Sequence, residues 1–270
     1  MRRFDQKFGP ELLESVPAEP GVYRFLDASG AVLYVGKARN LRRRLSQYRL
    51  AGPGKRGRKP RKIVKAASAL TWEVHASELE ASLAEVRLIQ ALKPPLNIAG
   101  AFDFLYPMVG IGRVRDAVRF AYTTRPEELT GFELHGAYRS RDTTAEAFYA
   151  LMRLLRRVGH PENLPAAKAR MKRTRVHGLR RLPDGWDAAW AAYFRGEDAS
   201  VLGVLAVMLL EKPSARKEAA EVEDDLKSLR RFFKEEARPL ADAVRATGYT
   251  AWPVPQCDRD PLFVRHRASG

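Results

Sequence analysis

Two short, mostly apolar segments lie near the N-terminus, residues 22–26 and 32–36, and both are rich in β-branched and aromatic residues. A glycine-containing stretch separates them, so the pattern predicts a β-hairpin. A symmetric turn would place Tyr23 directly opposite Tyr34 on one face of this hairpin. A shift of one residue would put the two phenols on opposite faces. Taken alone, the pair is more typical of aromatic packing that only stabilises a hairpin.

The next segment has the periodicity of a helix. Asn40 is well placed to cap a helix that begins directly after it. At about 100° per residue, one apolar stripe runs along this helix: Leu41, Leu45 and Tyr48. Arg44 lies on the flank of the stripe and Arg43 on the opposite side. Arg44 is therefore the arginine that we expect to point toward the body of the domain.

Residues 50–60 consist mainly of Gly, Pro, Lys and Arg. This composition predicts a flexible basic loop, which would either follow a nucleic-acid backbone or form a disordered connection. We expect a helix from about Arg61 and a strand at residues 70–74.

A further helix carries a charge within an apolar stripe. Ser77 and Glu80 have the spacing of a capping box, which predicts a helix that runs to about Leu92. On this helix Glu85 falls among apolar residues: Ala81, Leu88, Ile89 and Leu92. An ionised carboxylate in such surroundings is costly unless a cation compensates it. A divalent metal would do so, and the alternative is a purely structural salt bridge between Glu85 and Arg44.

Positive charge is concentrated in one stretch of the chain. Between Ala28 and Trp72 there is no Asp or Glu, yet this stretch holds thirteen basic residues, which we call the basic block. They are Lys37, Arg39, Arg42, Arg43, Arg44, Arg49, Lys55, Arg56, Arg58, Lys59, Arg61, Lys62 and Lys65. A field of one sign repels itself unless a polyanion neutralises it, and nucleic acid is the natural partner. An anionic membrane ranks well below, because the glycines and proline at residues 52–57 leave no long amphipathic helix.

The overall composition agrees with this interpretation. The chain has 270 residues, 45% of them hydrophobic, and a formal net charge of +16. Its single cysteine, Cys257, excludes an intrachain disulfide framework and a cysteine-rich metal or iron–sulfur site, which suits a reducing cytoplasm. No signal peptide is visible, and the apolar run at residues 201–210 predicts a buried helix that is too short to span a membrane. The five histidines lack metal-ligand spacing, so none is assigned a catalytic role.

Several separated motifs now resemble a known family. Residues 20–36 read PGVYRFLDASGAVLYVG and continue as KARNLRRRL. This is similar to the GIY-YIG nuclease domain, and specifically to its UvrC/Cho excinuclease branch. The similarity continues, in the same order, at residues 77–85, 88–89, 93–94 and 96–98.

The resemblance implies roles for seven residues. It implies that Tyr23 and Tyr34 are the family's two signature tyrosines, Lys37 the lysine after the second, Arg44 the catalytic arginine, Tyr48 a further tyrosine near the site, Glu85 the single metal-binding glutamate, and Asn97 the asparagine that closes the domain. It also implies an α+β fold in which a small three-stranded antiparallel sheet is flanked by helices. One divalent metal, Mg²⁺ or Mn²⁺, would bind at Glu85.

Hydrolysis of a phosphodiester requires a base, neutralisation of charge at phosphorus and help for the departing oxygen. The metal would act as a Lewis acid, and Arg44 would clamp the phosphate through its planar fork. A phenol with a pKa of about 10 is a poor base without help from Lys37 or a metal-bound water, and the sequence leaves open which tyrosine serves. The expected contacts to nucleic acid are Arg39, Arg42, Arg43, Lys55, Arg56, Arg58, Lys59, Arg61 and Lys62.

The pattern is less specific beyond residue 100. Residues 101–112 resemble the segment in which these excinucleases continue past their catalytic domain. We expect strands at residues 118–123 and 132–138, and a helix at residues 143–158 that begins with a capping box at Thr143.

The chain after Asp184 is expected to be mostly α-helical. It resembles, weakly, the region through which these proteins contact a helicase, but a solvated helical hairpin that packs on its own domain is the favoured interpretation. The expected domains are a nuclease domain at residues 1–100, a mixed α/β post-nuclease region at 101–183, a helical region at 184–250 and a tail at 251–270.

Three features of full-length UvrC are absent from this sequence: the cysteine cluster, the RNase-H-like second nuclease and the tandem helix-hairpin-helix modules. We therefore expect no iron–sulfur cluster and no dual incision. The resemblance implies a Cho-like endonuclease of the bacterial cytoplasm and nucleoid, which makes one nick in DNA, on the 3′ side of a lesion in nucleotide excision repair, with a UvrB-like helicase as a partner. The alternatives are a structure-specific or recombination endonuclease and a DNA-binding module whose nuclease centre is idle. The intact set of site residues argues against the idle module.

Overall fold

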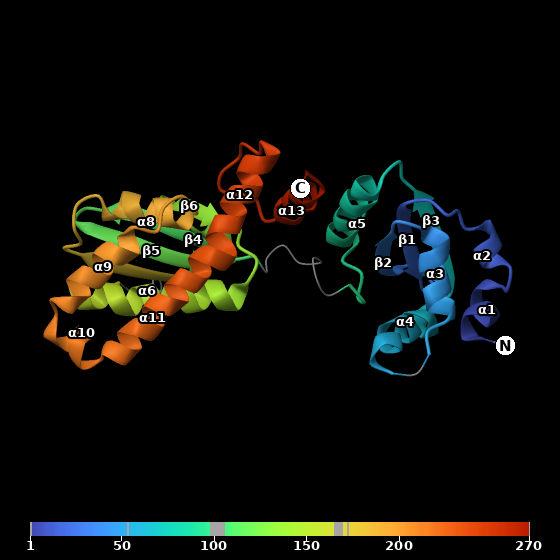
Figure 1. The fold of residues 1–270 in the computed structure, drawn as a ribbon, viewed down its shortest axis with the longest axis horizontal. Helices are drawn as coiled ribbons and strands as arrows, with labels where there is room; N and C mark the ends of the chain where they lie inside the picture. The colour runs from blue at the N-terminus through green and yellow to red at the C-terminus, as the bar shows by residue number, and fades with distance from the viewer. Residues whose placement is uncertain (1, 53, 98–105, 165–169, 172, 270) are drawn as a thin grey trace. The chain divides into compact units, whose positions relative to one another are not determined.

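The computed structural model divides into two compact units, residues 1–103 with 263–270, and residues 104–262 (Figure 1). The described residues are 2–52, 54–97, 106–164, 170–171 and 173–269. The four-part domain division expected from the sequence stays a prediction.

A three-stranded antiparallel sheet forms the centre of the first unit, with the strand order β2–β1–β3. The strands are β1 Gly21–Leu26, β2 Val32–Ala38 and β3 Ala69–Val74. The helices described in this unit are α1 Arg3–Phe8, α2 Leu12–Ser15, α3 Leu41–Arg49, α4 Lys55–Ala66 and α5 Glu78–Leu92. The predicted α+β fold is therefore confirmed.

The two faces of this sheet pack against different helices, because side chains alternate along each strand. Tyr23 and Phe25 lie on the face whose core is completed by apolar residues of α1, α3 and α4. Val22 lies on the other face, against Ala81 and Ile89 of α5. Strand β2 is thus an edge strand between two layers of helices, and its edge is where residues from both layers can meet.

The register of the hairpin differs from the predicted one. Tyr23 lies opposite Gly36, and Phe25 lies opposite Tyr34. The pairing is thus shifted by two residues from the expected pairing of Tyr23 with Tyr34. Because a shift of two preserves the face, both tyrosines remain on the same side of the sheet as diagonal neighbours, with ring centroids 6.3 Å apart.

The cause of the shift is a longer loop than a symmetric turn would need. The backbone N–H of Asp27 donates to the carbonyl of Ala31 at 2.9 Å, and the Asp27 carboxylate accepts from the N–H of Ser29 at 2.8 Å. Gly30 adopts a φ of +85°, a conformation that favours glycine. A β-bulge between Phe25 and Leu26, at the end of β1, accounts for the rest of the two-residue shift in register.

Two predicted helix starts are confirmed by their caps. The side chain of Asn40 accepts from the backbone N–H of Arg43 at 2.9 Å. The hydroxyl of Ser77 accepts from the N–H of Glu80 at 3.1 Å, and the Glu80 carboxylate accepts from the N–H of Ala76 at 3.2 Å. The capping box thus fixes where α5 begins.

The prediction for the basic stretch was wrong. A loop was expected over residues 50–60 and a helix from about Arg61, but α4 already begins at Lys55 and contains Pro60. Ile63 of this helix is buried in the core on the face of the sheet that carries the tyrosines. Packing of that apolar side outweighs the low helix propensity of glycine and proline.

A six-stranded antiparallel sheet lies at the centre of the second unit, in the order β6–β4–β5–β9–β7, with β8 paired to β9. Its strands are β4 Met108–Val114, β5 Ala117–Thr123, β6 Glu133–Gly136, β7 His160–Pro161, β8 Arg170–Met171 and β9 Thr174–Arg180. The predicted strands at 118–123 and 132–138 correspond to β5 and β6. The sequence missed β4 and β9, because glycines interrupt the first and arginines replace apolar residues in the second.

Helices cover this sheet, and further helices follow along the chain to Ser269, where residues 263–270 belong to the first unit. The predicted helical region is confirmed. They are α6 Arg141–Val158, α8 Trp186–Phe194, α9 Val201–Leu210, α10 Pro213–Lys217, α11 Ala219–Phe232, a π-helical turn Phe233–Ala237, α12 Arg238–Thr247 and α13 Arg259–Ser269. Helix α8 packs on β4 and β6, α6 packs on β7 and β9, and α11 lies alongside α6 (Figure 1).

Three details of this region differ from expectation. The cap of α6 is Ser140, whose hydroxyl accepts from the N–H of Thr143 at 3.1 Å, so Thr143 lies inside the helix rather than before it. Helix α13 occupies most of the expected tail, because Leu262 is buried. Helix α9 is not fully buried, since Val207 is 59% exposed and Leu210 is 66% exposed on its outer side. None of the described helices is both long and apolar enough to cross a bilayer.

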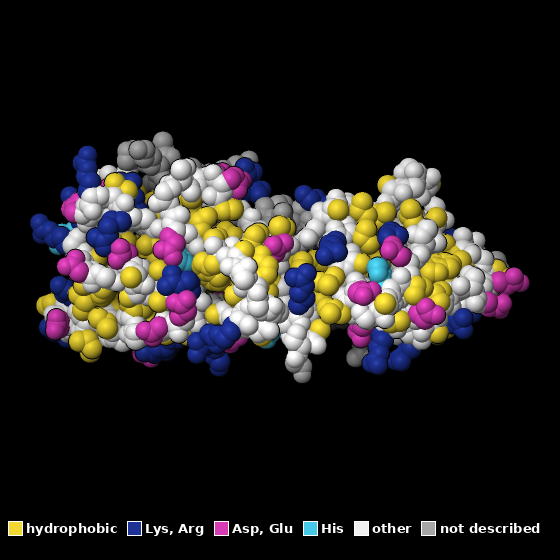
Figure 2. All heavy atoms as spheres, turned by 90° about the horizontal axis from the view of Figure 1, so that it is seen from above, with side chains coloured by type: hydrophobic (Ala, Val, Ile, Leu, Met, Phe, Trp, Pro, Cys, Tyr) yellow, Lys and Arg dark blue, Asp and Glu magenta, His cyan; other side chains and the backbone are white. Residues whose placement is uncertain are grey.

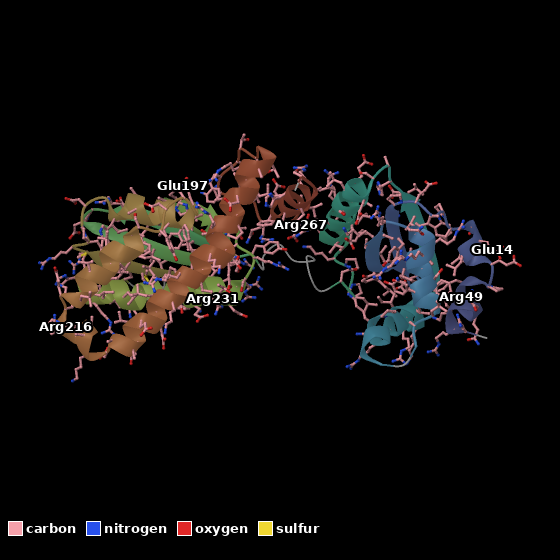
Figure 3. All side chains as sticks on the ribbon, viewed as in Figure 1. Glu14, Arg49, Glu197, Arg216, Arg231 and Arg267 are labelled. Atoms are coloured by element: carbon pink, nitrogen blue, oxygen red, sulfur yellow. The ribbon has the colours of Figure 1, made fainter. Side chains whose placement is uncertain are left out.

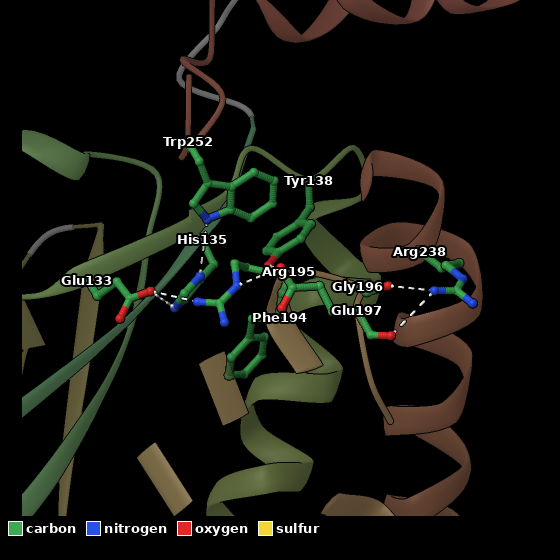
Figure 4. A network of polar contacts seen from close by, with 9 residues as sticks. All are labelled: Glu133, His135, Tyr138, Phe194, Arg195, Gly196, Glu197, Arg238 and Trp252. Atoms are coloured by element: carbon green, nitrogen blue, oxygen red, sulfur yellow. Dashed lines mark hydrogen bonds and ion pairs between the residues drawn. The ribbon is translucent and has the colours of Figure 1, made fainter. Parts of the chain in front are cut away.

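Buried His135 illustrates how the second unit holds polar groups (Figure 4). Its Nδ1 accepts a hydrogen bond from the Trp252 indole at 3.4 Å, and its ring stacks on Phe194. Burial, together with the nearby Arg195 guanidinium, lowers the pKa of His135 to about 3. The imidazole is therefore neutral at physiological pH. That none of the histidines is catalytic stays a prediction.

Candidate active site

Helix α3 and the sheet bring two tyrosines and an arginine into contact. The hydroxyl of Tyr23 lies 3.0 Å from that of Tyr48 and accepts a hydrogen bond from Nε of Arg44 at 3.1 Å. The guanidinium of Arg44 lies 5.6 Å from the centroid of the Tyr48 ring and donates to Oε1 of Gln47 at 2.9 Å. Two hydrogen bonds thus fix the side chain of Arg44, one from Nε to Tyr23 and one from Nη1 to Gln47, and the residue is exposed at the surface of the unit.

Two glycines make this packing possible. A Cβ at Gly36 would overlap the phenol of Tyr23, which lies over that position. A Cβ at Gly21 would meet the carbonyl of Glu73 and the side chain of Leu41. Both glycines are therefore required by close approach of neighbouring groups rather than by an unusual backbone conformation.

Tyr34 lies beside Tyr23 and next to a lysine of α4. Its hydroxyl forms no hydrogen bond with any described residue, although the side chain is only 8% exposed. Nζ of Lys59 lies 5.0 Å from the centroid of the Tyr34 ring, a cation–π contact. The sequence had placed Lys59 only among the general contacts to nucleic acid, because the expected loop gave no reason to bring it to the tyrosine.

The side chains of Glu85 and Asn97 form hydrogen bonds with backbone groups on the outer edge of β2. The amide of Asn97 accepts from the N–H of Val35 and donates to its carbonyl, both at 2.8 Å. Oε1 of Glu85 accepts from the backbone N–H of Lys37 at 3.1 Å. Asn97 thus takes the place of a neighbouring strand at this point of the edge. Its role as the residue that closes the domain stays a prediction.

Helix α5 holds Lys37 at a second point. Nζ of Lys37 donates to the hydroxyl of Ser82 at 2.6 Å, and that hydroxyl donates to the carbonyl of Glu78 at 2.7 Å. Ser82 is 4% exposed and lies one turn before Glu85 on the same side of α5. Sequence reasoning missed Ser82. Its helical spacing from Glu85 was the available signal, and a serine on an apolar stripe has no specific chemistry until its partner is known.

The carboxylate of Glu85 is half-buried and forms no ion pair with another described residue, so the alternative salt bridge to Arg44 is not formed. Burial raises its pKa, and the fields of Lys37, Arg44 and Lys59 oppose that shift. A carboxylate with one oxygen free suits a hard divalent cation that keeps most of its waters. No cluster of three or more His, Cys, Asp or Glu side chains suited to a metal occurs among the described residues. That Glu85 is the single metal-binding glutamate stays a prediction.

The buried phenols are weak acids. Burial raises the pKa of Tyr23 to about 12, and Tyr34 adds to the shift, whereas the hydrogen bonds from Tyr48 and Arg44 oppose it. Burial raises the pKa of Tyr48 still further. Neither phenol is ionised near neutral pH unless a cation or a substrate changes its surroundings.

Two cavities flank Arg44 and Gln47, and both residues line each of them. One has a volume of about 660 Å³ and is also lined by Lys37, Arg39 and Arg43. The other has a volume of about 330 Å³ and is also lined by Tyr48, Ala51, Gly52, Gly57 and Pro60. The arginine therefore stands between a strongly basic cavity and one beside α4.

The remaining predicted contacts to nucleic acid are distributed around this centre. Nε of Arg42 donates to the carbonyl of Val16 at 2.7 Å, so its guanidinium also joins α3 to the preceding segment. The exposed residues of the set on α4 are Arg58, Lys59, Arg61 and Lys62. The side chains of Lys55 and Arg56 lie outside the described part of the structure. All these contacts stay predictions.

Comparison with known proteins identifies the nuclease-like segment. Residues 19–98 match the UvrC-like GIY-YIG domain. The UvrABC system protein C of Arthrobacter sp. is 32% identical over 250 residues, which are 84% of this chain and 36% of that protein. The same protein of Kocuria rhizophila is 38% identical over 141 residues, which are 52% of this chain and 20% of that protein. This chain therefore spans about a third or less of these relatives.

Among solved structures, the chain is similar to the GIY-YIG N-terminal endonuclease domain of UvrC from Thermotoga maritima, determined with its catalytic divalent cation, magnesium. The identity is 32%, the match covers 36% of this chain and 99% of that domain, and the TM-score is 0.30.

Proposed function

The chain belongs to the UvrC-like branch of the GIY-YIG nuclease family, and from this membership we propose that it is a metal-dependent endonuclease that cuts one strand of DNA by phosphodiester hydrolysis. The observation that supports this function best is the carboxylate of Glu85. It is half-buried, lacks an ion pair among the described residues and is joined through Lys37 to the strand that carries Tyr34. A purely structural glutamate would be expected to have a cationic partner.

The residues of the site meet the chemical needs of hydrolysis. A divalent cation such as Mg²⁺ at Glu85 would supply Lewis-acid neutralisation of phosphate charge. Arg44, fixed by Tyr23 and Gln47, binds phosphate oxygens through its planar fork. Lys37, fixed by Ser82, keeps a second positive charge beside Glu85. Together they concentrate positive charge where negative charge develops in the transition state.

A phenol accepts the proton of the attacking water in this proposal. The hydroxyl of Tyr34 is not committed to a described partner, whereas that of Tyr23 is engaged by Tyr48 and Arg44. The Arg44 contact would stabilise a phenolate on Tyr23, so both residues are candidates. Separate substitutions by phenylalanine distinguish them through the pH dependence of the rate.

The two cavities suggest the path of the substrate. A DNA strand that runs from the basic cavity beside Arg43 to the cavity beside Pro60 would pass Arg44, which lines both. Exposed lysines and arginines of α4 would then contact neighbouring phosphates, which positions the strand without reading its sequence.

The biological role that we propose is the 3′-side incision of nucleotide excision repair, with DNA as the substrate and a UvrB-like helicase as the partner. This role is supported by the similarity to UvrABC system protein C. It is more specific than nuclease activity, because it also includes the side of incision, the lesion and the partner. Incision side, lesion choice and partner are therefore tested separately from hydrolysis.

The central test is conversion of supercoiled plasmid to nicked circle, with Mg²⁺ and with EDTA. We expect nicking only with Mg²⁺, and we expect Glu85→Gln to reduce its rate by about 100-fold or more, since it removes a charge that contacts the metal. Glu80→Gln is the matched control, because it removes the same charge from α5 at the capping position and preserves an acceptor for Ala76. Equal rates for Glu85→Gln and the unmodified protein would contradict the proposal. Binding of plasmid without nicking would support the idle module.

The repair role is tested with end-labelled duplexes that are intact, pre-nicked, branched or lesion-bearing, each with and without a UvrB-like helicase. We expect preferred cutting of the lesion duplex on the 3′ side of the lesion when the helicase is present. Cutting at branches without the helicase would support a structure-specific or recombination endonuclease instead.

A further inference from the structure

We propose that the second unit contains a binding site for one unpaired nucleotide of a single-stranded nucleic acid. The site is a cavity of about 700 Å³ lined by residues of α6, of β9 and of the segment that begins with β7. It lies in a different unit from Glu85 and Arg44, so it extends the proposed function rather than restating it. Its volume is within the usual range for a site that takes a small molecule.

The cavity has a positive group from α6 that the fold does not neutralise. Arg156 is exposed and forms no ion pair with a described carboxylate, although its Nη2 donates to Nδ1 of His177 at 3.1 Å. The neighbouring arginines of the same helix are paired, Arg153 with Asp225 and Arg157 with Glu218. Of these three arginines, Arg156 is therefore the one whose charge is available to a phosphate.

Aromatic rings form another wall of the cavity. Tyr149 lies two helical turns before Arg156 on the same side of α6, and it is 38% exposed. Its ring packs edge-on against His177, with centroids 6.5 Å apart and an interplanar angle of 82°. Because a guanidinium only donates, Nδ1 of His177 accepts from Arg156, and a neutral ring then carries its proton on Nε2. An exposed phenol ring beside a donor is a suitable surface for a nucleobase.

The carboxylate that lines the cavity does not oppose an anion. Glu162 accepts two hydrogen bonds from Arg119, at 2.9 and 2.6 Å. The Arg119 guanidinium lowers the pKa of Glu162, so the carboxylate is ionised and its charge is compensated. Gly178 permits this arrangement, since a Cβ there would overlap the Glu162 side chain.

The combination of groups identifies the class of ligand. An arginine can bind the phosphate, an exposed phenol ring can stack on the base, and the amide of Asn163, which also lines the cavity, can bond to a base edge. A paired base in a duplex could not enter, because its faces and its Watson–Crick edge are occupied. The site therefore suits a nucleotide that has left the stack, such as one in single-stranded DNA.

The test is the affinity of the full chain for a fluorescein-labelled single-stranded oligothymidylate, measured by fluorescence anisotropy in EDTA so that nothing is cut. We expect Tyr149→Ala to weaken binding about fivefold or more, and Tyr149→Phe to retain it, because stacking needs only the ring. We expect Arg156→Ala to weaken binding and to reduce the slope of log affinity against log salt by about 0.7. Arg153→Ala is the matched control, since it removes the same charge from the same helix.

Direct evidence comes from photo-crosslinking of the same oligonucleotide with 5-iodouracil in place of one thymine, followed by peptide mapping. Crosslinks to the peptide that contains Tyr149 would support the site. Affinities of Tyr149→Ala and Arg156→Ala that equal that of Arg153→Ala, with no crosslink in the lining segments, would overturn it. Since no step depends on cleavage, a protein that shows this pattern but never nicks plasmid would refute only the proposed endonuclease.

Discussion

The two units are both rich in arginine, but they differ in how often a carboxylate neutralises its charge. In the basic block of the first unit, Arg49, which is labelled in Figure 3, is the one described residue with an ion-pair partner, the carboxylate of Asp5 at 2.6 Å. In the second unit, arginine is paired repeatedly, for example Arg113 with Asp187 at 2.9 Å and Arg119 with Glu162 at 2.6 Å. In the left part of Figure 2, Lys and Arg side chains are accordingly interspersed with Asp and Glu.

This difference shows why net charge alone says little about where a polyanion binds. A paired arginine contributes to the fold and has little field left for a partner, whereas an uncompensated one must be balanced by solvent ions or by a ligand. The basic block keeps its charge because no acidic residue occurs within it. The predictions below separate the two kinds of arginine by what is lost when each is removed.

The largest effect that we expect is the salt dependence of DNA binding. If about six phosphates are contacted by the basic block, affinity for duplex DNA should fall about a thousandfold between 50 and 200 mM salt. Substituting Arg58, Arg61 and Lys62 by glutamine should reduce the slope of log affinity against log salt by about 0.9 for each charge. The same number of glutamines at Arg113, Arg231 and Arg245, which are ion-paired, should leave the slope unchanged. Equal slopes for both triple variants would show that unpaired and ion-paired basic residues contribute equally to DNA binding, and would contradict the proposed difference between the units.

The second effect concerns Arg44 and distinguishes catalysis from binding. We expect Arg44→Ala to lower the turnover number for plasmid nicking by about 10²- to 10³-fold, because a preorganised phosphate contact is lost. The loss in DNA affinity should be smaller, since the rest of the basic block remains. Arg43→Ala is the control, because Arg43 lines the same basic cavity one position earlier, whereas the hydrogen bonds to Tyr23 and Gln47 are made by Arg44. Equal losses in turnover and affinity would make Arg44 a binding residue only.

The third effect is the pH dependence of nicking. If the proton acceptor is Tyr23, whose pKa is about 12, the ionised fraction rises tenfold with each pH unit below that value. The rate of nicking should then increase with pH with a slope near one between about pH 7 and 10. Tyr23→Phe should abolish the slope, while Tyr34→Phe should retain it, and the reverse result would assign Tyr34. On the acid side, burial raises the pKa of the metal-free Glu85 carboxyl, so Mg²⁺ binding should begin to weaken at a higher pH than it would for an exposed glutamate.

The smallest effect is on stability in the second unit. Arg153→Ala leaves the buried carboxylate of Asp225 without its partner, and we expect a loss of about 1–2 kcal/mol in the free energy of unfolding in urea. Arg156→Ala, on the same helix and without a carboxylate partner, should change stability by less than about 0.5 kcal/mol. A similar loss of stability in both variants would show that pairing with a carboxylate does not decide whether an arginine stabilises the second unit.

Local signals were reliable wherever the structure depends on neighbouring residues. The side chain of Asn40 and the capping box at Ser77 fixed two helix starts, because a cap is a contact within one turn. The same reasoning misplaced the start of α6, since Ser140 and Thr143 both had the required chemistry. The N-terminal half of helix α4, before Arg61, was missed because the stability of this helix comes from burial of Ile63, which no local pattern of Gly, Pro and Lys reveals.

For the site, the sequence determined the chemistry of its members: a pair of tyrosines on one face of a hairpin, an arginine flanking an apolar stripe, and a glutamate within another. The tertiary structure decided how they meet. It set the register through the loop after β1, seated Tyr23 over Gly36, and joined Glu85 and Ser82 to Lys37. The physical reason is the range of each interaction. Periodicity and capping act within a few residues, whereas Lys37 is separated by more than forty residues from its two partners on α5, Ser82 and Glu85. Only the packing of the layers could specify them.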